Sequence, residues 1–193
     1  MKVVIEVSAR HIHLSREAVD ILFGEGYELT PKRFLSQPGQ FLSEEKVEIV
    51  GPRNSIKKVS VLGPLRNKTQ VELSMTDARM TGIDTVIRES GDLSGTAGCE
   101  IIGIKGKYRI KEGVIIAKRH IHMTPKDAEK YNLKDGQDIA VKISDKLRSL
   151  IFGNVVVRVS EKFSLACHID TDEANAAGIK SETFGEMILK SPL

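Results

Sequence analysis

The sequence of 193 residues contains no tryptophan, and aromatic residues make up only 5% of it. This scarcity argues against a surface on which the bases of single-stranded nucleic acid would stack. The two cysteines, Cys99 and Cys167, are too few for a disulfide framework, and no Cys-x-x-Cys motif is present, so the composition suits a reducing compartment. No apolar run approaches the length of a membrane span, and no basic-then-apolar leader opens the chain. We therefore expect a cytoplasmic protein without a membrane segment.

Basic and acidic residues are nearly balanced, and the formal net charge is only +3. A broad nucleic-acid surface would need a larger basic excess. The balance instead predicts a local site for an anionic small molecule and no partner that is a nucleic acid or a membrane.

Histidine is scarce but concentrated. Four of the five histidines lie in two copies of one tripeptide, His11-Ile12-His13 and His120-Ile121-His122, each preceded by an arginine, Arg10 or Arg119. β-Branched residues before each copy predict that it ends a strand, on which residues i and i+2 face the same side. Each copy would then direct two imidazoles at one point. One such pair alone is usually ordinary, but the duplication favours a metal site, and two metals over one.

The second half of the chain repeats the pattern of the first. Each tripeptide is followed by a predicted short capped helix, and further short strands alternate polar and apolar residues between turn signals, as in 46–50 and 58–62 around the turn 51–54. The glycine-rich segment 90–98 is interpreted as a connection between domains rather than a phosphate cradle. We predict a mainly β protein of two tandem related small antiparallel β-barrel domains with short capping helices, covering 1–98 and 99–193. Periodicity alone does not separate barrels from sandwiches.

Three further residues are candidates for the site. His168 is the one histidine outside the tripeptides, and with His120 and His122 it would form a three-imidazole set that leaves one zinc position open. Glu72 shares a strand face with Gln70, but by pattern alone it is one of many carboxylates. Arg66 lies in a Gly-Pro loop, and its fork matches phosphate oxygens; on the residues alone, a solvated loop arginine is the preferred interpretation.

Taken together, these motifs resemble the phosphate propanoyltransferase family of the propanediol-utilisation type. The resemblance spans the chain in order and rests on the stretches Ser8–Ser15, Leu62–Glu72, Arg88–Asp92, Lys118–Met123 and His168–Asn175. It implies two six-stranded barrels, two zinc ions, and transfer of an acyl group between coenzyme A and phosphate. Microcompartment members of the family carry an extra N-terminal encapsulation segment that this chain lacks, so we expect a free cytoplasmic enzyme acting on acetyl- or propanoyl-CoA. A homodimer is the default expectation for its assembly.

The resemblance also assigns residues. One zinc would be held by His11, His13 and Glu72. The other would be held by His120, His122 and His168. Arg66 would bind phosphate as the catalytic residue, and contacts to coenzyme A would come from Val7, Ser8, Ala9, Arg53 and Asn175.

For these implied zinc sites and Arg66 we predict direct attack of phosphate on the thioester, because no serine or cysteine nucleophile is flanked by a recognisable base. Two other interpretations stay open at this point. Paired His-x-His motifs also suit a dizinc hydrolase that activates water. A non-catalytic metal-binding β-barrel module would show the same motifs without turnover.

Overall fold

The computed structural model describes residues 1–144 and 147–189 of the chain, which folds into two compact units. We call Ala9–Ala117 the first barrel, and Met1–Ser8 together with Lys118–Leu193 the second barrel. This division differs from the sequence halves 1–98 and 99–193, because the strand that precedes each His-x-His tripeptide pairs within the other barrel. Among the described residues, no helix is both long and apolar enough to span a membrane.

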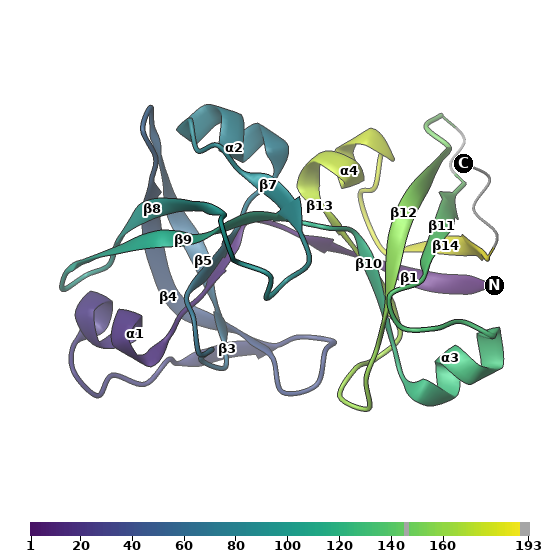
Figure 1. Ribbon diagram of the computed structural model, residues 1–193, viewed down its shortest axis with the longest axis horizontal. Coiled ribbons are helices and arrows are strands. Elements are labelled where there is room, and N and C mark those ends of the chain that lie inside the picture. The colour runs from purple at the N-terminus through teal and green to yellow at the C-terminus, as the bar shows by residue number, and fades with distance from the viewer. Residues whose placement is uncertain (145–146, 190–193) are drawn as a thin grey trace. The chain divides into compact units, whose positions relative to one another are not determined.

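The first barrel closes a ring of six strands (Figure 1). In ring order these are β4 (Phe41–Val50), β5 (Ser55–Gly63), β2 (His11–His13), β6 (Gln70–Glu72), β9 (Lys107–Ala117) and β8 (Ala97–Ile102), which returns to β4. Two further strands lie outside the ring, β3 (Pro31–Phe34) beside β4 and β7 (Val86–Arg88) beside β9.

The second barrel is a closed ring of six strands. Its order is β1 (Lys2–Ser8), β13 (Ala166–Asp170), β10 (His120–Met123), β12 (Leu150–Val159), β11 (Asp138–Ile143) and β14 (Thr183–Ile188). The N-terminal strand β1 therefore belongs to the barrel that contains the second tripeptide, as β9 belongs to the barrel that contains the first.

The two rings repeat one pattern of pairing. In the first ring, the His-x-His strand β2 pairs parallel with β5 and antiparallel with β6, and β6 pairs parallel with β9. In the second ring, β10 pairs parallel with β12 and antiparallel with β13, and β13 pairs parallel with β1. The prediction of a mainly β protein of two related barrels is confirmed. Most pairs in the rings are antiparallel, as expected, and each ring also contains parallel pairs between remote segments, which leave no local trace in the sequence.

The glycine-rich segment 90–98 lies inside the first barrel and is therefore not an interdomain connection. Its last residues open β8, which pairs with both β4 and β9. A side chain at Gly98 would collide with the backbone of Ile110 and Lys111. Glycine is needed there for close strand approach and not for flexibility.

A short helix follows each strand that carries histidine or glutamate candidates. The four helices are α1 (Arg16–Phe23), α2 (Met75–Thr81), α3 (Pro125–Tyr131) and α4 (Thr171–Ala176). Their N-caps are Ser15, Ser74, Thr124 and Asp170, and the last three form capping boxes. Each cap ends the preceding strand at a fixed residue, which fixes where the candidate side chains lie.

The isoleucine at the centre of each tripeptide is fully buried. Ile12 packs in the core of the first barrel and Ile121 in that of the second. Because strand residues alternate faces, burying this isoleucine turns the two flanking histidines to the opposite side.

Candidate metal centres

The first barrel brings His11, His13 and Glu72 together. One ligand atom from each lies within 4.8 Å of the others, and all three side chains are buried. The arrangement follows from register, because His11 on β2 stands directly opposite Glu72 on the antiparallel strand β6.

The two histidine rings of this cluster have different surroundings. His11 Nδ1 lies 2.9 Å from the backbone oxygen of Ala9, and its Nε2 lies 3.4 Å from Oε2 of Glu72. With Nδ1–H donating to the carbonyl, Nε2 keeps its lone pair for a cation. Nδ1 of His13 is buried and has no hydrogen-bond partner among the described residues. Burial, followed by the proximity of His11 and Arg66, holds the pKa of His13 well below its ordinary value. The imidazole is therefore neutral, the form that binds metals.

Polar groups form hydrogen bonds to the Glu72 oxygen Oε1, whereas His11 lies near the other oxygen, Oε2. Gln70 Nε2 donates to Oε1 of Glu72 at 2.6 Å, and the Ser90 hydroxyl lies 3.1 Å from the same oxygen. Arg66 Nη1 in turn donates to Ser90 Oγ at 3.1 Å. The predicted phosphate-binding arginine is thus joined to the candidate metal ligand through one hydroxyl.

The second barrel brings together His120, His122 and His168. Their ring centroids are 4.6 to 5.0 Å apart, and their ligand atoms lie within 4.8 Å of one another. His120 stands opposite His168 in the β10–β13 pair, at the register position that His11 and Glu72 occupy in the first barrel. His120 Nδ1 lies 2.9 Å from the backbone oxygen of Lys118, the same contact that orients His11.

His122 of this cluster is buried without a polar contact in the described part of the chain. Both of its ring nitrogens are buried and lack a hydrogen-bond partner among residues 1–144 and 147–189. Its ring stacks on Phe163 with centroids 3.9 Å apart and an interplanar angle of 15°. Burial, followed by the charges of His120, His168 and Arg158, lowers the pKa of His122 to about 2. An imidazole that is buried, neutral and without hydrogen bonds is costly unless a cation completes it.

Both clusters fit a divalent transition-metal ion. Nitrogen and carboxylate oxygen donors suit zinc, cobalt or iron, and sets of three protein ligands leave a coordination position for substrate. The orphaned nitrogens of His13 and His122 are the observation that supports this fit.

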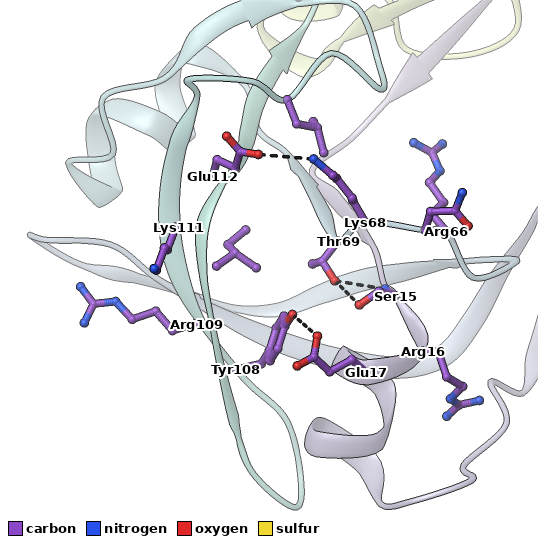
Figure 2. A pocket seen from close by; sticks show the side chains of 13 residues that line it. Ser15, Arg16, Glu17, Arg66, Lys68, Thr69, Tyr108, Arg109, Lys111 and Glu112 are labelled. Carbon is purple, nitrogen blue, oxygen red and sulfur yellow. Dashed lines mark hydrogen bonds and ion pairs between the residues drawn. The ribbon is translucent and has the colours of Figure 1, made fainter.

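An open pocket lies on the first barrel (Figure 2), and its lining includes Arg66 but not His11, His13 or Glu72. Two contacts join side chains of its wall: Lys68 Nζ lies 3.5 Å from Glu112, and the Tyr108 hydroxyl donates to Glu17 at 3.0 Å. Figure 2 shows the Arg66 side chain directed away from Tyr108 and Glu112. Arg66 therefore contributes to the pocket wall while its guanidinium faces Ser90.

The residues predicted to contact coenzyme A fall in both units. Val7 and Ser8 lie on β1 beside β13, and Asn175 is exposed on α4, which begins where β13 ends. Ala9 and Arg53 belong to the first barrel. Arg53 is exposed in the turn before β5, and its backbone N–H donates to Thr81 of α2 at 2.9 Å.

Sequence reasoning missed several residues that support the clusters. Ser90 lies 18 positions from Glu72, and Phe163 lies in a loop, so no periodic pattern marks either. Asp77 and Glu173 form ion pairs with Arg10 and Arg119 at 3.0 and 2.9 Å. The sequence did contain a signal for these two acids, because Asp77 follows Glu72 by five positions and Glu173 follows His168 by five positions.

The fold and the two clusters define a duplicated β-barrel protein with a metal-compatible centre in each barrel. The model of the phosphate propanoyltransferase family matches residues 4–180. A phosphate propanoyltransferase of Listeria monocytogenes is 52% identical over 187 residues, covering 97% of this chain and 87% of that protein. One of Thermotoga maritima is 55% identical over 175 residues, covering 91% and 83%, and one of Clostridioides difficile is 51% identical over 187 residues, covering 97% and 89%. This chain belongs to the phosphate propanoyltransferase family and is an acyltransferase.

Proposed function

We propose that this protein interconverts an acyl-CoA and phosphate with the acyl phosphate and free coenzyme A, with a zinc ion in each barrel. The observation that carries the proposal is the connection in the first barrel from the Arg66 guanidinium through Ser90 to the Glu72 carboxylate. It combines an anion-binding group with a metal-compatible cluster, as transfer to phosphate requires.

In this proposal the first zinc is held by His11, His13 and Glu72, and the second by His120, His122 and His168. Bound zinc supplies a Lewis acid for the thioester carbonyl and a soft partner for the departing thiolate. The protein's part is to keep His13 and His122 neutral through burial. It also aims His11 and His120 through the backbone oxygens of Ala9 and Lys118.

Arg66 binds the phosphate nucleophile in this scheme. Its fork is matched to two phosphate oxygens, and its charge offsets repulsion between phosphate and the anionic coenzyme A. A phosphate oxygen attacks the carbonyl carbon, the carbon–sulfur bond breaks, and the proton lost by phosphate accounts for the thiol of free coenzyme A. Ser90 keeps the guanidinium beside the cluster by accepting its hydrogen bond at 3.1 Å.

The contacts to coenzyme A remain part of the same proposal. Val7, Ser8, Ala9, Arg53 and Asn175 are the residues proposed to contact it. Acetyl-CoA and propanoyl-CoA are the acyl donors to test, in a cytoplasmic setting.

The test is release of thiol from each acyl-CoA, with and without phosphate, before and after treatment with a chelator. We expect release that requires phosphate and stops when metal is removed. Both protein thiols are buried, and burial raises the pKa of Cys99 and of Cys167 to about 12, so the folded protein adds little background to a thiol reagent. Release without phosphate would indicate a hydrolase, and metal binding without release would indicate a binding module; either result would overturn the proposal.

A further inference from the structure

Each barrel contains one ion pair in the same place relative to its cluster. In the first barrel Arg10 Nε lies 3.0 Å from Asp77, and in the second Arg119 Nε lies 2.9 Å from Glu173. Each arginine immediately precedes the first histidine of a tripeptide. Each acid lies five residues after the third cluster residue, Glu72 or His168.

This placement ties the two cluster strands together at one end. β2 begins at His11, and its antiparallel neighbour β6 ends at Glu72, so Arg10 and α2 meet where both strands present their cluster side chains. The second barrel repeats this with β10, β13 and α4. The same contact built twice from different acids, Asp and Glu, points to a geometric task.

The arginines also lie next to the carbonyls that aim the histidine rings. Ala9 O, which lies 2.9 Å from His11 Nδ1, belongs to the peptide that joins Ala9 to Arg10. Lys118 O stands in the same relation to Arg119 and His120. Holding the arginine therefore holds the carbonyl, and the carbonyl sets the direction of Nε2.

We propose that Arg10–Asp77 and Arg119–Glu173 are positioning pairs that pre-align the first histidine of each cluster for metal binding. The inference rests on the proposed metal sites. Each pair acts through the backbone and touches neither metal nor substrate. Removing one partner lets the tripeptide end move, so the cluster must be ordered when the ion binds, and affinity falls.

A role in capping the helices is the competing explanation. Asp77 Oδ2 is also a capping-box acceptor, 3.5 Å from the Ser74 N–H, and Glu173 accepts from the Asp170 N–H at 2.9 Å. The arginines take no part in either cap. Arg10→Gln and Arg119→Gln therefore remove the positioning pair and leave the capping boxes intact.

The experiment measures cobalt(II) affinity by competition with a chelator, one cluster at a time. A His122→Ala background isolates the first cluster, and a His13→Ala background isolates the second. In the first background Arg10→Gln, Asp77→Asn and their combination are compared, and in the second Arg119→Gln and Glu173→Gln. Glu44→Gln is the matched control, because it breaks the exposed Lys32–Glu44 pair of the same barrel, which lies at 2.9 Å. Thermal unfolding of each metal-free variant monitors the fold separately.

We expect each single substitution to weaken cobalt binding about tenfold, the scale of losses from outer-shell partners. The double variant should bind no more weakly than Arg10→Gln, because both changes remove one interaction. Visible absorption of the bound cobalt should shift in these variants and stay unchanged in Glu44→Gln. If Asp77→Asn fails to fold, Arg10→Gln alone carries the test.

Two results would overturn the inference, and only the second of them would also overturn the proposed metal sites. Parent backgrounds that bind cobalt, with variants within twofold of them, would reject the positioning pairs and leave the metal sites standing. Parent backgrounds that bind no cobalt would reject the metal sites and the positioning pairs together.

Discussion

The two clusters share one scaffold but differ at one register position. Opposite the first histidine of the tripeptide, the first barrel has Glu72 and the second has His168. With neutral imidazoles, a divalent ion would carry a net charge of +1 with the first ligand set and +2 with the second. With an ion bound, the second centre would be the stronger electrophile, and the first would hold its cation partly through the charge of Glu72.

On the next strand of each ring, β9 or β1, the carboxylate at the paired position is found in the second barrel and not in the first. Glu72 pairs with Ile115 of β9, whereas His168 pairs with Glu6 of β1, whose carboxylate lies 3.6 Å from His168 Nδ1. Each centre therefore has one carboxylate, in direct reach of the cation in the first barrel and behind a histidine in the second. The comparison teaches that a duplicated site can change its charge distribution by exchanging residues between two adjacent strands.

The surroundings diverge as well. The first cluster is bordered by donors, with Gln70, Ser90 and Arg66 in one hydrogen-bonded group. The second is covered by the Phe163 ring, stacked on His122, with Arg158 5.8 Å from the ring centroid. A polar environment suits an anionic nucleophile, which is why the proposed reaction has phosphate bound in the first barrel.

The largest expected effect tests that assignment. Arg66→Ala should lower turnover at least about a hundredfold while both metals are retained, because a preorganised charged donor to the reacting group is lost. The matched control is Lys162→Ala. Arg66 lies four residues after Leu62, which pairs with His13, and Lys162 lies four residues after Arg158, which pairs with His122. Steady-state rates and metal content of both variants are the measurements.

Equal losses from Arg66→Ala and Lys162→Ala would break the comparison, since the two barrels would then contribute alike to phosphate binding. Loss of metal in the Arg66 variant would show that its contact to Ser90 supports the cluster and not the substrate.

The sequence predicted the duplication, the strands and the capped helices well. The helix Pro125–Tyr131 is the short capped helix expected after the second tripeptide, because Thr124 and Pro125 fix its start. Local signals could not predict the parallel pairs or the exchange of β1 and β9 between the barrels, since these depend on contacts between remote segments. The tripeptides identified their clusters because histidine is scarce, whereas Glu72 needed the family resemblance to separate it from other carboxylates.

A smaller effect concerns the carboxylate behind His168. Glu6→Ile copies into the second barrel the residue that faces Glu72 in the first. We expect about tenfold weaker zinc binding at the second centre, because an outer carboxylate supports the basicity of a ligating imidazole. Chelator competition in a His13→Ala background, which leaves only the second cluster, measures this affinity.

The control for Glu6→Ile lies at the equivalent position of the other barrel. Ile115→Val changes volume but no charge, and zinc binding in a His122→Ala background should stay within twofold of the parent. An unchanged affinity in Glu6→Ile would mean that the second centre depends on its three imidazoles alone, which would remove the proposed exchange of carboxylates.

The smallest effect is a pH dependence of the metal-free protein. His13 and His122 both have pKa values lowered by burial, that of His122 to about 2. In the unfolded chain both histidines bind a proton near pH 6.5, whereas in the folded chain they stay neutral at that pH. The free energy of unfolding should therefore fall as pH drops below 6.5, by about 1 kcal/mol per pH unit for each histidine. Phe163→Ala exposes His122 and raises its pKa toward the ordinary value, so it should reduce the slope contributed by the second barrel only. Denaturant unfolding between pH 7.5 and 5 measures the slope, which separates this effect from the constant packing loss of the substitution. A slope that Phe163→Ala leaves unchanged would mean that the stacked ring does not keep His122 neutral, and the two clusters would then differ in charge but not in their shielding from water.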